Sequence, residues 1–144
     1  MRKLKQIAIL LLFTVPFAAC KKDKQKAPDY TLSEANLIGT YTYGTLTYKA
    51  TPTSSAVDAS SFVEACALDD QATFGTNHVL TYTDAGTTCN PAGDGTGSWS
   101  LQGNVFTTDL YHGTIQNFTD SAFTLANPDV FAVGDTVFIT FERK

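Results

Sequence analysis

Hydrophobic and polar residues alternate in short segments from residue 39 to the end of the chain. This two-residue period is typical of β-strands that turn one face toward a core. The pattern predicts strands at residues 39–49, 71–74, 79–83, 98–101, 105–110, 113–118, 122–125 and 136–142. A weaker segment at 61–65 is a further candidate, and one helical turn is expected at 33–37, capped by Thr31 or Ser33. The 22 Thr, 10 Phe and 6 Tyr also suit strands, so we expect an all-β domain.

The first predicted strand changes phase near its middle. Tyr41 and Tyr43 share one face, whereas Leu46 and Tyr48, beyond Gly44, fall in the opposite phase. A β-bulge or bend at Gly44 would return all four side chains to the same face. We therefore expect an irregularity at this glycine.

Turn residues separate most of the predicted strands by a few positions. The turns at 75–77, 102–104 and 119–121 consist largely of Gly, Asn, Asp, Ser and Thr. Successive short hairpins favour a small antiparallel up-and-down barrel of about eight or nine strands, because closure leaves no exposed edges. A two-sheet β-sandwich is the alternative, since strand count alone does not separate the two architectures.

The N-terminal segment follows a different pattern. Arg2, Lys3 and Lys5 precede an apolar run at residues 7–19 that ends in two alanines. Basic residues, a short apolar run and small residues in this order are typical of a secretory signal peptide. The run has 13 residues, whereas a membrane-spanning helix needs about 20. We therefore assign residues 1–19 to a signal peptide.

Residues 17–20, Phe-Ala-Ala-Cys, resemble the lipobox of bacterial lipoproteins. The resemblance implies cleavage before Cys20 and lipidation of Cys20, which would anchor the protein to a membrane. An ordinary signal peptide with an incidental cysteine is the alternative, because Phe17 stands where Leu or Val is usual. Residues 20–29 are rich in lysine and lack hydrophobic periodicity, so we interpret them as a solvated tether for a domain at 30–144. The expected location is the outer membrane, facing the periplasm, with exposure at the cell surface as the other orientation.

Charge is unevenly distributed along the chain. Residues 50–142 contain 11 acidic side chains and no Lys or Arg. A surface without cations cannot neutralise phosphates, so nucleic acid is not an expected partner. The same segment offers no cation to stabilise an anionic transition state, and no nucleophile there has a recognisable base. We therefore expect neither an enzyme nor a cofactor.

Several short motifs, taken in order, resemble the lipocalin-like lipoproteins of Bacteroidota-type bacteria. They are Gly-Thr-Tyr at 39–41, Cys-Ala-Leu-Asp-Asp-Gln-Ala-Thr-Phe at 66–74, Cys89, Gly-Ser-Trp-Ser-Leu at 97–101, Gly-Asn at 103–104 and Phe-Glu-Arg-Lys at 141–144. The resemblance covers roughly residues 37–144 and departs from the family pattern at Tyr41, where Trp is usual. It implies a lipocalin-like β-barrel without a known catalytic centre.

Cys66 and Cys89 are the two cysteines that remain if Cys20 is lipidated. In an exported protein they are expected to form a structural disulfide that closes a loop around the hairpin at 71–83. A redox or metal-binding pair is the alternative, but it would normally need closer spacing and further ligands.

The remaining candidate ligands do not form a metal-binding pattern. His78 and His112 lie on different predicted hairpins and have no neighbour at metal-ligand spacing. Asp69, Asp70 and Asp94 could lend oxygens to Ca²⁺, but they lack the repeated acidic positions of a calcium loop. We interpret these acids as solvated turn residues and expect no metal.

The aromatic residues determine how much room the barrel leaves for a ligand. Tyr41, Tyr43, Tyr82 and Trp99 are the candidate ligand-binding residues, because pockets often combine aromatic walls with a few polar groups. The same rings could instead fill the interior, and the small size of the barrel favours that arrangement.

These observations lead to two hypotheses about function. The first is a non-enzymatic, membrane-anchored module that binds a small apolar molecule or lipid. The second is a structural or interaction lipoprotein with a filled barrel, which presents its loops at 84–97 and 127–135 to another envelope protein of unknown identity. A cavity of about 300 Å³ or more would favour the first hypothesis, and a packed interior the second.

Overall fold

The structure, a computed structural model, describes residues 30–144. The signal peptide assigned to 1–19 and the tether with Cys20 lie outside the described residues. The strands are β1 (Gly39–Lys49), β2 (Val57–Asp58), β3 (Gln71–Phe74), β4 (Val79–Thr83), β5 (Gly95–Gln102), β6 (Val105–Thr108), β7 (His112–Gln116), β8 (Ala122–Pro128) and β9 (Thr136–Arg143). The short helical elements are α1 (Glu34–Leu37) and the 3₁₀ turns η1 (Ser60–Phe62), η2 (Ala65–Leu68) and η3 (Thr76–His78).

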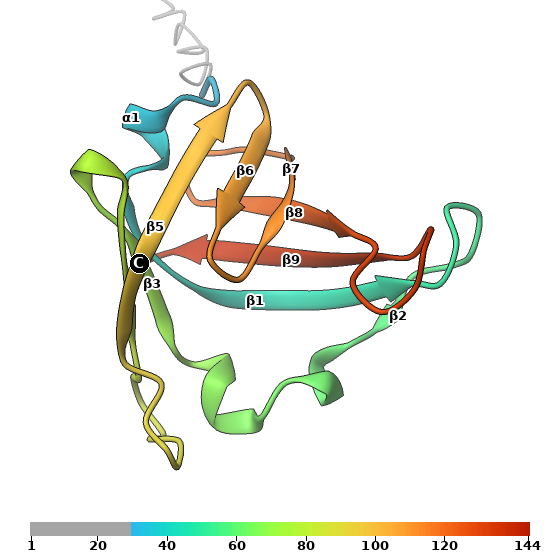
Figure 1. Cartoon of the computed structure of the whole chain (residues 1–144), viewed down its shortest axis with the longest axis horizontal. Helices are drawn as coiled ribbons and strands as arrows, with labels where there is room; N and C mark the ends of the chain where they lie inside the picture. Colours follow the sequence, from blue (N-terminus) through green and yellow to red (C-terminus); the bar gives the residue numbers. More distant parts are fainter. Residues whose placement is uncertain (1–29) are drawn as a thin grey trace, which may run out of the picture.

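The strands form a closed antiparallel barrel (Figure 1). From β3 to β9 each strand pairs with the next one along the chain, β1 pairs with β3, and β9 pairs back with β1. Eight strands therefore close the barrel, and β2 is an extra strand on the second half of β1. The predicted up-and-down barrel is confirmed, and the β1–β9 pairing excludes the two-sheet sandwich.

The irregularity expected at Gly44 is present. The register of β1 against β9 shifts between Tyr43, opposite Phe141, and Leu46, opposite Ile139, so β1 contains one more residue than its partner there. Because of this bulge, Tyr43 and Leu46 both face the interior. Ser33 caps α1, as expected for one of the two candidates, by accepting a hydrogen bond from the backbone N–H of Asn36.

The prediction of a strand at 61–65 is wrong. These residues lie in η1 and at the start of η2, and β2 forms just before them. The Asp58 carboxylate accepts hydrogen bonds from the backbone N–H and the hydroxyl of Ser60 and so fixes a turn. The Phe62 N–H then donates to the Ala59 carbonyl, three residues back, instead of to a neighbouring strand.

Strand β1 pairs with different partners along its length. Its first residues, from Gly39 to Thr42, pair with β3, whereas Thr47 and Tyr48 pair with β2. β1 and β3 are therefore hydrogen-bonded at one end of the barrel only. The segment with η1 and η2 lies beside the other end, between β2 and β3 in the sequence (Figure 1). We call the end next to α1 the closed end and the opposite one the open end.

Aromatic side chains fill the closed end. Leu37 of α1 is completely buried, and the Tyr41 hydroxyl donates to the Leu37 carbonyl at 3.0 Å. Arg143, at the end of β9, donates to the Ile38 carbonyl at 2.9 Å and covers the Tyr41 ring. The core beneath consists of fully or almost fully buried rings, namely Phe74, Trp99, Phe106, Phe123 and Phe141. Within residues 30–144, no helix has the length and apolar character needed to cross a bilayer.

Candidate functional site

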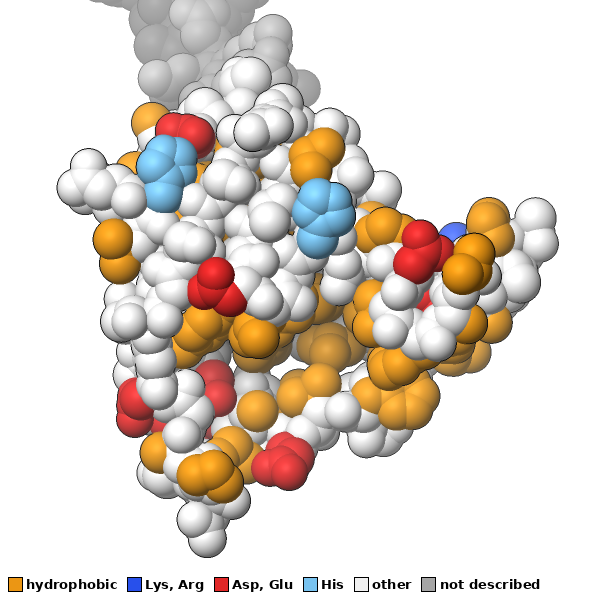
Figure 2. All heavy atoms as spheres, in the orientation of Figure 1, with side chains coloured by type: hydrophobic (Ala, Val, Ile, Leu, Met, Phe, Trp, Pro, Cys, Tyr) orange, Lys and Arg blue, Asp and Glu red, His pale blue; other side chains and the backbone are white. Residues whose placement is uncertain are grey.

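A cavity of about 650 Å³ occupies the open end of the barrel. Its lining residues come from β1, from β9 and from the segment with η1 and η2. Further lining residues come from β3 and β4 and from the connections between β6 and β7 and between β8 and β9. The side chains that give it apolar walls include Leu46, Phe62, Val63, Leu110, Val137 and Ile139. Figure 2 shows a hollow in this face of the molecule with hydrophobic side chains around it. The volume matches the range of small-molecule pockets, about 300–1,000 Å³.

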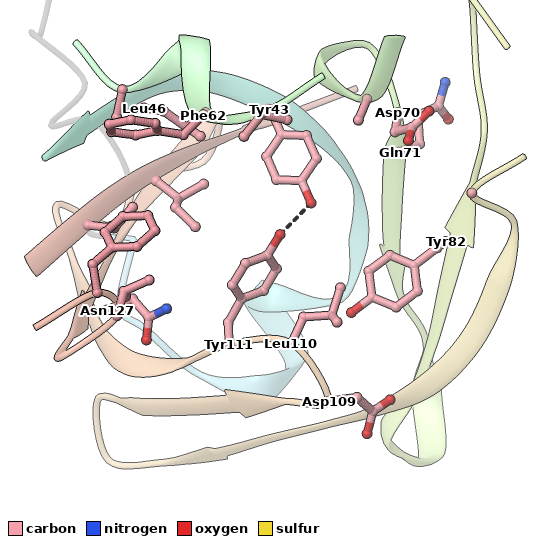
Figure 3. A pocket seen from close by; sticks show the side chains of 18 of the residues that line it. Tyr43, Leu46, Phe62, Asp70, Gln71, Tyr82, Asp109, Leu110, Tyr111 and Asn127 are labelled. Carbon is pink, nitrogen blue, oxygen red and sulfur yellow. Dashed lines mark hydrogen bonds between the residues drawn. The ribbon is translucent and has the colours of Figure 1, made fainter. Parts of the chain in front are cut away.

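Two tyrosine hydroxyls meet inside the cavity. Tyr43 of β1 and Tyr111, between β6 and β7, approach from opposite sides, and their oxygens are 2.6 Å apart (Figure 3). Burial raises the pKa of both phenols above the ordinary 10.0, so both are protonated at neutral pH. Because one hydroxyl donates to the other, the second keeps its own proton for a ligand.

A third hydroxyl, that of Tyr82 on β4, is buried beside this pair. Within the described residues it has no hydrogen-bond partner. The hydroxyl of Thr108 is near enough to lower the pKa of Tyr82, although burial raises it more. The Thr108 oxygen, however, already accepts from the backbone N–H groups of Leu110 and Tyr111. The O–H of Tyr82 is therefore left as an unused donor at the cavity wall.

Two carboxylates, Asp70 and Asp109, also line the cavity. Asp109 accepts hydrogen bonds from the backbone N–H and the hydroxyl of Ser98. Asp70 accepts from the Ala85 N–H at 3.1 Å. Burial raises the pKa of Asp70 above 3.8, the hydrogen bond from Ala85 lowers it in part, and three neighbouring acids raise it further. Those neighbours are Asp84, Asp69 and Asp94.

The structure divides the four candidate ligand-binding residues into two pairs. Tyr43 and Tyr82 line the cavity. Tyr41 and Trp99 are not among its lining residues, because both are buried in the closed end. The Tyr41 hydroxyl is used by Leu37 and Arg143, and the Trp99 indole N–H donates to the Gly75 carbonyl at 3.0 Å. The expectation that aromatic rings fill the interior is therefore correct for the closed end but not for the open end.

Several lining residues were not identified from the sequence. Tyr111 follows a predicted strand and precedes the next one, so alternation assigns it to neither face. Phe62 lies in the segment that was expected to be a strand, and Phe131 lies in the loop between β8 and β9. The sequence carried no periodic signal for these three positions, because they belong to connections and not to strands.

Cys66 and Cys89 form a disulfide, as predicted, with their Sγ atoms 2.01 Å apart. The bond connects η2 to the loop between β4 and β5. Glu64 lies near the two sulfurs, which brings three typical metal-ligand types together. Because the sulfurs are bonded to each other, they do not act as thiolate ligands for a metal.

The acids next to the disulfide organise the loop between β4 and β5. Asp69 accepts from the Thr87 N–H, Asp84 from the N–H groups of Cys89 and Gly93, and Asp94 from the Asp84 N–H. These contacts agree with the interpretation of the acids as turn residues. His78 and His112 contact different groups, the carbonyl of Trp99 and the hydroxyl of Thr107, and so do not share a site.

The cavity combines apolar walls, three phenol hydroxyls and two carboxylates, and none of the described residues that line it is a Lys or an Arg. No known family model, curated protein or solved structure matches this chain.

Proposed function

We propose that this protein is a non-enzymatic, lipid-anchored lipoprotein that binds a small apolar molecule in the open end of a lipocalin-like barrel. The cavity of about 650 Å³ is the observation that carries the proposal, because it is roughly twice the 300 Å³ at which ligand pockets begin. Apolar walls favour an apolar ligand, since each Å² removed from water contributes about 25 cal/mol. The phenol hydroxyls would then bind a polar group of that ligand.

Titration with N-phenyl-1-naphthylamine, an uncharged apolar fluorophore, tests the proposal. We expect saturable binding at one site and a rise in the thermal unfolding midpoint that follows the probe concentration. Trp99 is a poor reporter, because it is packed in the closed end and does not line the cavity.

A pair of tryptophan substitutions locates the binding site. Val63 lines the cavity, so Val63→Trp should fill it and weaken probe binding at least tenfold. Val105 lies on β6, is 39% exposed and is not part of the lining, so Val105→Trp should bind like the unmodified protein. Absence of saturable binding, or equal binding by the two variants, would contradict the carrier function.

The proposed anchor is tested separately. Cys20→Ser should release the folded protein from the membrane fraction, because a covalent lipid is the proposed anchor. Retention of this variant in membranes at high salt would overturn the lipoprotein assignment and leave the binding proposal untouched.

A second function, an interaction lipoprotein that presents loops, is favoured by one observation. Phe62 and Phe131 are 65% and 62% exposed and contact each other and Tyr48 at the rim of the open end. Exposed apolar clusters of this kind often mark contact surfaces. Replacing both phenylalanines with serine would abolish partner capture under this hypothesis, whereas the carrier function predicts weaker fluorophore binding by the same variant, because both rings also line the cavity.

A further inference from the structure

Acidic side chains outnumber basic ones in the domain, and the charged residues that line the cavity are acidic. Residues 30–144 contain twelve Asp and Glu side chains and three Lys and Arg. The three cations lie elsewhere. Arg143 donates to the Ile38 carbonyl in the closed end, and the backbone N–H of Lys144 donates to the Thr40 carbonyl in the same region. The ammonium group of Lys49 lies over the Phe138 ring. None of them lines the cavity.

Carboxylates, by contrast, lie in the cavity wall and directly behind it. Asp70 and Asp109 are lining residues, and Asp69, Asp84 and Asp94 are close enough to Asp70 to raise its pKa. Asp70 and Asp109 in turn raise the pKa of Tyr43 and Tyr82. A positive charge placed in the cavity is therefore attracted by several carboxylates, and a negative charge is repelled by the same groups.

The hydroxyls inside the cavity accept either kind of polar group. The O–H of Tyr82 has no acceptor within residues 30–144, and the pair formed by Tyr43 and Tyr111 keeps one unused proton and several lone pairs. They can donate to an oxygen or accept from an ammonium group. The faces of the three rings add attraction for a cation alone. Hydrogen bonding therefore leaves the choice of ligand open, and the charge decides it.

We propose that the cavity selects apolar molecules with a cationic head group, such as an alkylammonium, over carboxylates of the same chain length. The ammonium group would lie near Asp70 and Asp109, with the apolar chain along Leu46, Val137 and Ile139. This inference rests on the proposed function, because it names the class of ligand for the same cavity.

Competition against the uncharged fluorophore tests the selectivity. Dodecylammonium, dodecanol and dodecanoate have the same chain length and are used below their micellar concentrations. At about 20 mM salt, we expect dodecylammonium to bind at least fivefold more tightly than dodecanoate, with dodecanol between them. A smaller ratio would overturn the inference. The ratio should also fall at 0.5 M salt, because exposed charges are screened there.

Two matched double variants identify the carboxylates responsible. Asp70→Asn with Asp109→Asn removes two charges from the cavity and keeps an acceptor oxygen for Ala85 and for Ser98. Glu34→Gln with Asp120→Asn removes two charges from exposed positions that are not part of the lining. The first variant should lose at least threefold of the ammonium preference, and the second should retain it. Equal losses in the two variants would contradict the role of the cavity carboxylates.

Failure of this inference differs from failure of the proposed function. If the fluorophore and dodecanol bind but dodecylammonium is not preferred, the selectivity is wrong and the carrier function stands. If the fluorophore does not bind, the carrier function itself fails. The salt dependence of the unmodified protein decides the selectivity even if the asparagine variant does not fold.

Discussion

The two ends of the barrel are built from the same strands but differ in packing. At the closed end, β1 pairs with both β3 and β9, and buried aromatic rings fill the space between them. At the open end, β1 pairs with β2 and β9, and β3 is no longer its neighbour. The segment with η1 and η2 lines the space there, and a cavity of about 650 Å³ remains.

The polar groups differ between the ends in the same way. In the closed end, the Tyr41 hydroxyl and the Arg143 guanidinium bond to α1 and to each other, although the Arg143 Nε has no partner among the described residues. In the open end, the Tyr82 hydroxyl has no partner among the described residues, and the pair of Tyr43 and Tyr111 is partly satisfied. Arg143 does not line the cavity, whereas Tyr82 does, so the unused hydroxyl at the open end is the one that a ligand can reach. We infer that the closed end supplies stability and the open end supplies function.

Gly39 illustrates how tightly the closed end is packed. Its φ of 155° is a conformation that L side chains rarely adopt, and a Cβ atom there would collide with the Arg143 guanidinium. The Arg143 guanidinium can occupy this place because Gly39 has no side chain.

Truncation of one side chain at each end should show the largest difference in the free energy of unfolding. Phe123 is fully buried and stacks on Phe141 at a centroid distance of 4.9 Å. Phe123→Ala should lower the free energy of unfolding by about 3–5 kcal/mol, because it leaves a cavity in the closed end. Leu110→Ala at the open end, where Leu110 is 64% exposed, should change it by no more than about 0.5 kcal/mol. Urea unfolding measures both values, and similar losses would contradict the division of roles.

Removal of the disulfide should be the largest stability change available at the open end. Cys66 and Cys89 are 23 positions apart, so the bond should stabilise the domain by about 3 kcal/mol through loop closure. The double Cys66→Ser, Cys89→Ser variant should lose that amount, and a reductant should then have no further effect. Peptide mapping should find that these two cysteines are not alkylated in the unreduced protein and become alkylated after reduction. Free thiols at both positions in the unreduced protein would refute the bond.

Hydroxyl deletions compare the polar groups of the two ends. Tyr41→Phe should lower the free energy of unfolding by about 2 kcal/mol, because it leaves the Leu37 carbonyl and an Arg143 N–H unpaired in a buried site. Tyr43→Phe should lower it by less than about 1 kcal/mol, because Tyr111 borders the cavity and can reach water or a ligand there. A larger loss of unfolding free energy for Tyr43→Phe than for Tyr41→Phe would show that the tyrosine pair has a structural role.

The smallest expected effects concern two acids near the open end whose pKa values move in opposite directions. Burial and neighbouring acids raise the pKa of Asp70, so its ionised form opposes folding. Asp70→Asn should therefore raise the unfolding midpoint at pH 7, and the gain should vanish below the unfolded value of 3.8.

Asp135 provides the comparison for Asp70, because its pKa is shifted in the opposite direction. Burial by itself raises its pKa, but the N–H groups of Ala132, Phe131 and Val130 and the Tyr48 hydroxyl outweigh it and lower the pKa below 3.8. Its contribution to stability is present above 3.8 and is lost as the pH falls through the folded pKa. Asp135→Asn should therefore lower the unfolding midpoint at pH 7, and the deficit should shrink toward pH 3. Thermal scans from pH 7 to 3 compare the two variants. A change of the unfolding midpoint at pH 7 in the same direction for both would contradict these assignments.

Most of the strands could be predicted from the sequence, because alternation with a period of two is a local property, but the two-residue β2 could not. The sequence placed β1, β3 and β4 at their observed bounds, and the phase change at Gly44 predicted the bulge. The expectation of an exported protein, together with the cysteine count, also predicted the disulfide between Cys66 and Cys89. The segment at 61–65 was misassigned, because the Asp58 carboxylate accepts hydrogen bonds from Ser60 that compete with strand pairing there.

The tertiary structure alone decided where the barrel is filled and where it is open. Alternation shows which side chains face inward, but it does not show how far apart the opposite walls are. Tyr41 and Tyr43 share one face of one strand, yet one lies in the packed core and the other lines the cavity. The meeting of Tyr43 with Tyr111, 68 positions away, likewise depends on the closure of β9 onto β1 and on a connection that carries no period. Such long-range distances follow from strand tilt and register around the whole barrel, which local patterns do not encode.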